Sequence, residues 1–262
     1  MTKGPIKHRI QRIQRHLGVK PDGVIGPATL TAIEEALFDE ATKADVQKDF
    51  ALTVSRKGLK QLVNHEIGSE AYYRRALSHP VWPGGRSGVT IGIGYDLGYN
   101  SENQIRKDWV KMLSDLDLER LIAVSGLKGA AAKEAAKNVR SVTVPIESAQ
   151  EVFFEATRPR YAQMTRKTYP GVEKLHPDAQ TALLSLIYNR GTSLTGARRT
   201  EMAAIKELVA TGDYEGIAVQ IRSMKRLWEG RGLSGLLKRR DHEAKLVRLS
   251  DREYDTAELI RV

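Results

Sequence analysis

The sequence predicts a mainly helical protein: a small helical N-terminal module, then a larger helical domain with one short β-hairpin. Apolar residues recur at helical spacing along most of the chain. The best strand candidate is residues 89–93, where β-branched residues alternate with glycine. The 262 residues are 41% hydrophobic, enough for one sizeable core and a small extra module. We place the division at residue 50, giving parts 1–50 and 51–262.

The N-terminal part is predicted to hold two short helices around a turn. An apolar stripe with a basic outer face indicates the first helix, and its members are Ile10, Ile13 and Leu17. Gly18 is placed to end it, and residues 20–23 have turn chemistry. A second helix is expected near Pro27, with an apolar stripe of Leu30, Ile33 and Leu37. Residues 38–54 are mixed and charged, and we interpret them as a connector.

The larger part is predicted to begin near Ser55 and to be helical over most of its length. The expected helices are 59–67, 108–124, the alanine-rich stretch after Gly129, 147–157, 178–188, 200–210, 214–224 and 233–247. The stretch 178–188 is strongly apolar, so we expect it to be the central core helix.

The net charge of +10 and the pI near 9.7 predict a polyanionic partner, namely nucleic acid, anionic lipid or an anionic wall polymer. Composition alone does not choose among them. A basic group in the last third is interpreted either as solvated helix faces or as a surface for anionic wall or outer-membrane lipid. Its members are Arg198, Arg199, Arg222, Lys225, Arg226, Arg231, Lys238, Arg239 and Arg240.

The chain has no cysteine, which excludes disulfides and thiolate metal sites. Its six histidines are scattered in the sequence without metal-binding spacing, so we expect no metal and no cofactor. The first residues lack the apolar stretch of a signal peptide, and no apolar run approaches a membrane span. We therefore expect a monomer that is made in the cytoplasm and has no transmembrane segment.

Two carboxyl groups and a hydroxyl form the candidate catalytic set. Glu66 lies near the end of a predicted helix beside Ile67, where partly apolar surroundings would raise a carboxyl pKa, as a general acid requires. Glycosidases use two carboxyl groups, and Asp96 can supply the second while Thr90 helps to hold a water. Taken singly, each residue has a simpler explanation, such as a solvated charge or a turn former. The glycines of residues 92–98 do not have the dinucleotide-binding spacing.

Glu66, followed by Thr-Ile-Gly-Ile-Gly-Tyr-Asp at 90–96, resembles the active-site hairpin of phage-type lysozymes. An acid six residues after the threonine resembles the pesticin-like muramidases, which implies that Glu66 is the acid and that Thr90 and Asp96 complete the set. Many phage lysozymes place the second acid before the threonine, but no acid lies between Glu70 and Thr90, and Glu70 is the nearest alternative. Tyr95 stands where many relatives have histidine and is expected to contact substrate or to be structural.

The resemblance continues through Ala182-Leu-Leu-Ser-Leu-Ile-Tyr-Asn-Arg-Gly191 and Arg231-Gly-Leu-Ser-Gly-Leu-Leu-Lys-Arg-Arg-Asp-His-Glu243. These stretches are similar to the central helix and the C-terminal arginine-pair helix of the family, so the similarity covers roughly residues 55–250. It implies a mainly α, lysozyme-like fold (α+β). Asn189 and Arg190 are expected to line the glycan groove, although Asn189 could instead cap the helix end.

The N-terminal part resembles the peptidoglycan-binding module of wall hydrolases. Its Asp-Gly-x-x-Gly-x-x-Thr-x-x-Ala signature begins at residue 22 and places Asp22, Gly23, Gly26 and Thr29. Gly23 and Gly26 would permit a tight turn, and Asp22 can cap backbone amides, so these residues could be purely structural. Whether they also contact ligand stays open.

Together these resemblances imply a modular phage endolysin that hydrolyses the β-1,4 bond between N-acetylmuramic acid and N-acetylglucosamine of bacterial peptidoglycan. A lytic transglycosylase is the first alternative, and Asp96 argues against it because that reaction needs no second carboxylate. A bacteriocin or secreted effector could carry the same domain. A non-enzymatic wall- or nucleic-acid-binding protein is the remaining alternative. No DNA-binding motif is present, so nucleic acid is not expected as a partner.

Overall fold

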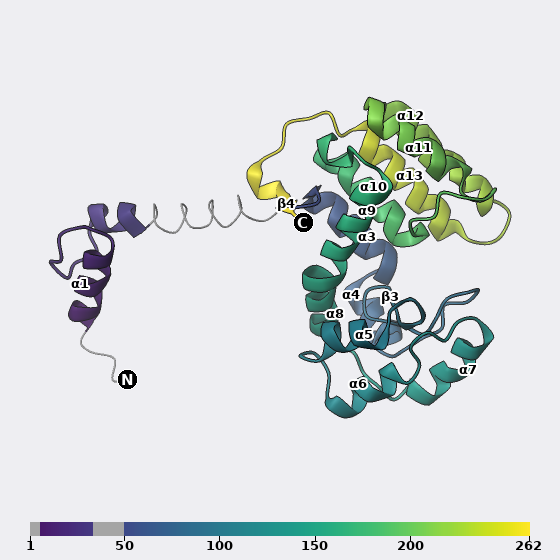
Figure 1. The fold of residues 1–262 in the computed structure, drawn as a ribbon, viewed down its shortest axis with the longest axis horizontal. Helices are drawn as coiled ribbons and strands as arrows, with labels where there is room; N and C mark the ends of the chain where they lie inside the picture. Colours follow the sequence, from purple (N-terminus) through teal and green to yellow (C-terminus); the bar gives the residue numbers. More distant parts are fainter. Residues whose placement is uncertain (1–5, 34–49) are drawn as a thin grey trace. The chain divides into compact units, whose positions relative to one another are not determined.

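The computed structural model describes residues 6–33 and 50–262. The chain divides into two compact units, residues 1–50 and 51–262 (Figure 1). Helices dominate the described residues, and the strands are short. The prediction of a mainly helical fold with a small hairpin is therefore confirmed.

The first unit contains α1 (Ile6–His16) and a second helix that begins at Pro27 and is described to residue 33. Gly18 has a positive φ of 72° after α1, as predicted for a residue that ends a helix. The predicted stripes are wrong at Ile13 and Leu30, which are 47% and 49% exposed, whereas Gln14 is buried. Leu37 and connector residues 38–49 lie outside the described residues.

The core of the second unit surrounds α10 (Pro177–Arg190), where residues 178–187 are all buried. Pro177 starts the helix and Gly191 ends it with a φ of 70°. The helix packs against α3 (Arg56–Ile67), α9 (Arg158–Thr168) and α13 (Ser234–Arg248). A helix that is buried on all sides has neighbours on all sides, which makes α10 the central helix, as predicted.

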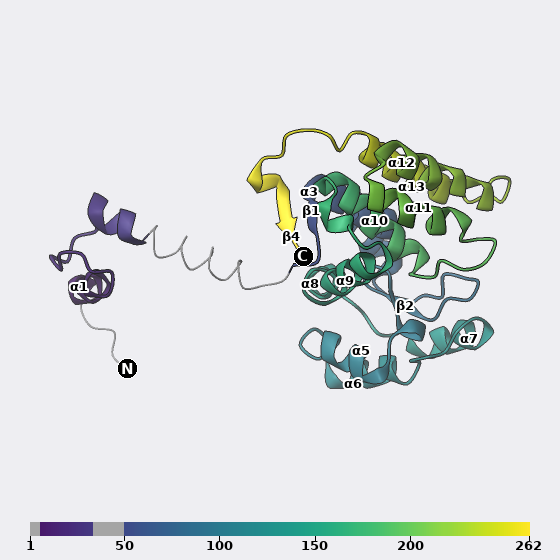
Figure 2. The same cartoon turned by 45° about the horizontal axis from the view of Figure 1, so that its top comes forward.

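Helices gather on two sides of α10. One side holds α11 (Thr200–Thr211), which packs on α12 (Tyr214–Ser223), and α12 in turn packs on α13. The other holds α5 (Glu102–Trp109), α6 (Asp115–Ile122) and α7 (Ala130–Val139). Both views show this separation within the second unit (Figures 1 and 2). The hairpin described below lies between α10 and the α5–α7 side.

Several helices differ from prediction. The single helix expected at 108–124 is interrupted after Trp109, and Ser114 caps α6 by accepting a hydrogen bond from the Asp117 amide. A helix after 157 was not predicted, yet α8 (Ile146–Val152) continues through a π-turn, Phe153–Thr157, into α9. A second π-turn, Tyr73–Leu77, follows α4 (Glu70–Tyr72). Short 3₁₀ turns occur at Leu97–Tyr99, Val172–Lys174, Met224–Leu227 and Thr256–Glu258.

Two small antiparallel pairs complete the second unit. β1 (Thr53–Ser55) pairs with β4 (Leu259–Arg261), which joins the two ends of this unit and was not predicted. Leu52 and Val262 exchange two further backbone hydrogen bonds, of 3.0 and 2.8 Å. β2 (Thr90–Ile91) pairs with β3 (Tyr95–Asp96) in the predicted hairpin.

Candidate active site

The hairpin brings the sequence-predicted catalytic residues together. Thr90 is paired directly with Asp96, so their side chains lie on the same face of the two strands. The turn between the strands contains Gly94, whose φ is 67°. A Cβ at Gly94 would lie 2.9 Å from Glu66 Oε2, so the Glu66 carboxyl reaches the hairpin turn.

The two oxygens of Glu66 have different surroundings. Oε1 accepts a hydrogen bond of 2.6 Å from Nη1 of Arg239, a residue 173 positions later in the chain. Oε2 lies beside Gly94 and accepts no hydrogen bond from any residue that the structure describes. The Glu66 side chain is 17% exposed and that of Arg239 only 3%. One oxygen is therefore anchored from inside the protein, while the other is left available.

Arg239 belongs to a buried polar network on α10 and α13. It donates to Glu243 Oε1 at 3.1 Å and to the Ser185 carbonyl at 3.0 Å. Ser185 Oγ and Arg240 donate to the same Glu243 oxygen, at 2.6 and 2.8 Å. The interpretation of Arg239 and Arg240 as surface residues is therefore wrong. The apolar setting expected for Glu66 is also incorrect, because its partner is a buried cation.

Other members of the basic group form ion pairs of their own. Arg222 and Lys225 both contact Asp241, at 3.1 and 2.8 Å. Arg226 pairs with Glu201. These contacts occupy part of the positive charge of the last third, so that charge is not all available for an external polyanion.

Asp96 is held by backbone amides at the base of the hairpin. The Gly88 amide lies 3.0 Å from both carboxylate oxygens, and the Gly98 amide donates to Oδ1 at 2.8 Å. A Cβ at Gly88 would overlap Asp96 and Gly98, so this close approach requires glycine. Burial raises the pKa of Asp96, although the Gly88 and Gly98 amides and the Lys128 charge act in the opposite direction.

Two tyrosines that the sequence did not single out lie beside the carboxyl groups. Tyr188 on α10 donates a hydrogen bond to the Ile93 carbonyl in the hairpin turn, and its ring is 4.6 Å from that of Tyr161. Burial raises the pKa of Tyr161; Arg160 opposes this, and the charges of Glu66 and Asp96 raise it further. Both carboxyl groups therefore lie within electrostatic reach of one phenol.

Tyr95 lies in the core. Its side chain is 3% exposed, and its hydroxyl donates to Asp108 Oδ2 at 2.8 Å. Its ring packs edge-on against Trp109 with centroids 5.5 Å apart. Asp108 also accepts from Arg160 at 2.9 Å. Of the two roles expected for Tyr95, these contacts favour the structural one, because they leave little of its surface accessible to a substrate.

Asn189 and Arg190 occupy the last turn of α10. Gly191 ends that helix, so the interpretation of Asn189 as a helix cap is wrong. Within the described residues, Asn189 Oδ1 is buried without a hydrogen-bond partner. The guanidinium of Arg190 lies 5.0 Å from the centre of the Trp228 ring. Both residues are partly exposed.

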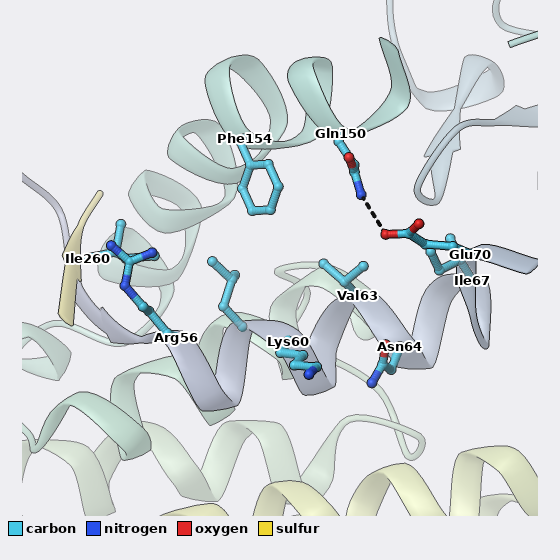
Figure 3. A pocket seen from close by; sticks show the side chains of 10 residues that line it. Arg56, Lys60, Val63, Asn64, Ile67, Glu70, Gln150, Phe154 and Ile260 are labelled. Atoms are coloured by element: carbon cyan, nitrogen blue, oxygen red, sulfur yellow. Dashed lines mark hydrogen bonds between the residues drawn. The ribbon is translucent and has the colours of Figure 1, made fainter. Parts of the chain in front are cut away.

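Glu70 is separated from this constellation. A cavity of about 290 Å³ lies along α3, and Glu66 is not among the residues that line it. Glu70 contributes to this cavity and accepts a hydrogen bond of 3.5 Å from Gln150, as Figure 3 shows. The apolar part of the lining includes Val63 and Phe154 (Figure 3). Glu70 is therefore a poor substitute for Asp96 as the second carboxylate.

Two of the histidines expected to be scattered are in contact. His65 Nε2 lies 3.3 Å from His242 Nδ1, which connects α3 to α13 beside Glu66. Burial lowers the pKa of His65 to about 4, and the charge of Arg239 adds to this effect. His65 is therefore a neutral group in the folded protein near pH 7.

In the first unit, Gln14 organises the signature residues. Its Nε2 lies 2.8 Å from Asp22 Oδ1 and 3.0 Å from Thr29 Oγ1, and its Oε1 accepts from the Gly23 amide at 2.8 Å. Gly23 has a positive φ of 81°, whereas Gly26 does not have a positive φ, so the expected conformational need holds only for Gly23. The sequence-based prediction did not identify Gln14, because a glutamine between basic residues is typical of a solvated helix face.

A family model described as a domain of unknown function (DUF8812) matches residues 60–230, well over half of the chain. The chain belongs to the DUF8812 family. No curated protein matches it. The DUF8812 match contains Glu66, the hairpin and α10, while Arg239 lies beyond its end. Among residues 6–33 and 50–262, no helix has the length and apolarity needed to cross a bilayer.

Proposed function

We propose that the protein is a muramidase that hydrolyses the β-1,4 bond between N-acetylmuramic acid and N-acetylglucosamine of bacterial peptidoglycan. The observation that carries this proposal is the unequal placement of the two Glu66 oxygens. A general acid needs a fixed orientation and an accessible oxygen that can carry the transferred proton. Arg239 supports the first requirement by holding Oε1, and the unpartnered Oε2 beside Gly94 supports the second.

In this proposal Glu66 protonates the glycosidic oxygen, and Asp96 with Thr90 positions a water on the opposite face of the sugar. The direct pairing of Thr90 with Asp96 supports this, because it sets a hydroxyl and a carboxylate side by side. By analogy with the resembled family, the expected outcome is inversion at the anomeric carbon. Asn189 and Arg190, at the end of α10, are proposed to contact the glycan.

A lytic transglycosylase is the second candidate, because three backbone amide contacts already occupy Asp96. That reaction requires Glu66 but no carboxylate that activates water. The product distinguishes the two mechanisms. A hydrolase leaves a reducing N-acetylmuramic acid end, whereas a transglycosylase leaves an anhydro end.

We further propose that the first unit binds peptidoglycan and that the chain acts as a phage endolysin after release through a separate membrane pore. The resemblance of residues 10–32 to a wall-binding module supports the first part. The positive net charge is compatible with an anionic wall or outer-membrane lipid as a second contact. A bacteriocin or effector muramidase would perform the same chemistry by another route of delivery.

The decisive experiment is mass spectrometry of the muropeptides that Glu66→Gln and Glu70→Gln release from purified wall. In Glu66→Gln the new amide can still accept from Arg239 but has no acidic proton, so we expect a rate loss of roughly 10²–10⁴-fold without a large change in Tm. Glu70→Gln is the matched control and should keep most of the wild-type rate. Cleavage by Glu66→Gln within about tenfold of wild type would place the acid elsewhere.

A further inference from the structure

A group of arginines surrounds two aromatic side chains where the ends of α9 and α10 meet α13. Arg190 and Arg240 lie 5.0 and 5.7 Å from the centre of the Trp228 ring. Tyr169 follows α9 directly, and Arg199, Arg190 and Arg240 all lie within electrostatic reach of its phenol. We call Tyr169, Arg190, Arg199 and Arg240 the arginine cluster.

The arginine cluster has several buried hydrogen-bond donors with nothing to donate to. Among the described residues, partners are missing for Tyr169 Oη, Arg190 Nε, and Arg240 Nε and Nη1. Tyr169 and Arg240 are both 0% exposed, so bulk water does not compensate these donors. A buried donor without an acceptor destabilises the folded state, and more so when it is charged. Several together indicate an absent acceptor.

The charge balance points in the same direction. Glu243 is shared between Arg239 and Arg240, and Glu201 is engaged by Arg226. Burial lowers the pKa of Arg190 to about 10, and the neighbouring charges of Arg199 and Arg240 act in the same direction. The cluster therefore carries more positive charge than its own acidic neighbours neutralise, and an anion would relieve this repulsion.

We propose that the arginine cluster is a subsite for a carboxylate group. The unpaired N–H groups of Arg190 and Arg240 can donate charge-assisted hydrogen bonds to a carboxylate, and the Tyr169 hydroxyl adds a further donor. The subsite is connected to the proposed acid, because Arg240 and Arg239 share Glu243 and Arg239 holds Glu66. The identity of this carboxylate rests on the proposed muramidase function: it is a carboxylate carried by the peptide branches of peptidoglycan.

A buried water is the competing occupant, because Glu243 Oε2 is also buried without a partner, among the described residues, beside Arg240. The unfolding temperature (Tm) of the full chain distinguishes a carboxylate from a water in this site. It is measured in sodium acetate and in sodium chloride at the same ionic strength of about 0.15 M. We expect acetate to raise the Tm of the wild type above its value in chloride. In Arg190→Gln the apparent affinity for acetate should fall at least about tenfold.

Two further variants make the result specific. Tyr169→Phe keeps the packing and removes one unpaired hydroxyl, so it should fold with unchanged or higher Tm in chloride and show a smaller acetate shift. Arg140→Gln makes the same charge change at an exposed position on the α5–α7 side and should keep the full shift. Equal acetate shifts in the wild type, Arg190→Gln and Tyr169→Phe would overturn the subsite and favour water.

A second experiment compares the cleavage of glycan strands that carry peptides with the cleavage of strands without peptides. The wild type should cleave peptide-bearing strands with a higher kcat/KM, and Arg190→Gln should bring the ratio of the two substrates towards one. The acetate melt requires no turnover, so it tests the subsite even if no strand is cleaved and the muramidase proposal fails. Conversely, cleavage without an acetate effect and without a preference for peptide-bearing strands would overturn the subsite alone.

Discussion

At the scale of single residues, Arg239 is the group on which the geometry of Glu66 depends. A buried arginine is tolerated when its donors are matched, and Arg239 has acceptors on Glu66, Glu243 and Ser185. Lysine could not span these three acceptors, because it lacks the planar fork of donors. The orientation of the candidate acid is thus set by α10 and α13 as well as by its own helix.

His65 gives the folded protein a predictable sensitivity to acid. The unfolded chain takes up a proton on this group near pH 6.5, whereas burial keeps it neutral in the folded state down to about pH 4. The unfolded state therefore binds more protons in this window, and stability falls as the pH is lowered through it. The free energy of unfolding of His65→Gln should fall less steeply between pH 6.5 and 4 in denaturant titrations.

His242→Gln is the matched control for this prediction, because it removes the exposed partner and leaves His65 buried. It should keep most of the wild-type pH dependence. Identical slopes for the wild type and His65→Gln would show that other groups dominate the acid sensitivity.

Asp96 should influence both stability and the pH profile of activity. In Asp96→Asn an amide N–H replaces an oxygen that faces the Gly88 and Gly98 amides, which should cost about 1–3 kcal/mol of stability. Only the ionised form of Asp96 can position the water, so activity should be lost when Asp96 is protonated. Since burial raises its pKa, the acidic limb of kcat/KM should lie above pH 3.8. Rates on soluble glycan oligomers between about pH 3 and pH 8 test this.

A folded Asp96→Asn enzyme with a nearly wild-type rate would show that Asp96 acts only as a brace of the hairpin. Thr90→Ala should lose less activity than Asp96→Asn, because a hydroxyl orients water without carrying charge. Reversal of that order would reassign the second role to Thr90.

The sequence could predict the hairpin residues of the site but not their partners. Glu66, Thr90 and Asp96 belong to a short motif, and the register of the hairpin fixes the proximity of the last two, so local spacing was sufficient for them. Arg239 lies 173 residues from Glu66 in a run of basic residues, and spacing alone does not show which of them is buried. The assignment of Tyr95 likewise depended on side chains that only the folded chain brings to it.

At the scale of elements, the hairpin turn is built to admit the Glu66 carboxyl. Gly94→Ala should therefore reduce both the stability of the protein and its cleavage activity. The positive φ strains any residue with a Cβ, at about 1 kcal/mol, and the new methyl would lie 2.9 Å from Glu66 Oε2. We expect a modest loss of Tm and a large loss of glycan cleavage.

Gly85→Ala separates these two effects. Gly85 also has a positive φ, of 61°, but nothing lies within 4 Å of its Cβ position. The control should share the loss of stability and keep its activity. Similar rates for the two variants would mean that the approach of Gly94 to Glu66 does not matter for catalysis.

Sequence periodicity was sufficient to predict several of the longer helices of the second unit. The central helix α10 and the terminal helix α13 match their predicted ranges within a few residues. It failed where one polar residue or one turn decides the outcome, as at Ser114, whose capping hydrogen bond starts a new helix. The continuation from α8 through a π-turn into α9 was missed because helical spacing changes there.

At the scale of the whole molecule, the second unit is joined at its own ends. β1, near the start of this unit, pairs with β4, and Leu52 exchanges hydrogen bonds with Val262. No local pattern predicts a pair of three-residue strands separated by about 200 residues, because short strands are stable only with a partner. The pairing shows where the second unit begins more sharply than composition did.

Truncation tests this organisation. Deleting residues 2–49 leaves β1, Leu52 and every residue of the proposed catalytic set. The truncated protein should therefore fold, with a Tm close to that of the second unit in the full-length chain. It should cleave soluble glycan at the wild-type rate but clear intact wall more slowly, because the proposed wall-binding unit no longer raises the local concentration of enzyme. Deleting residues 2–55 removes β1 as well, leaving β4 without its partner and the core without buried Val54, and should lower the Tm by several degrees more. Circular dichroism melts and dye release from soluble and insoluble wall fragments measure both effects. If the shorter deletion already abolished cleavage of soluble fragments, residues 1–49 would belong to the catalytic fold, and the wall-binding role of the first unit would have to be abandoned.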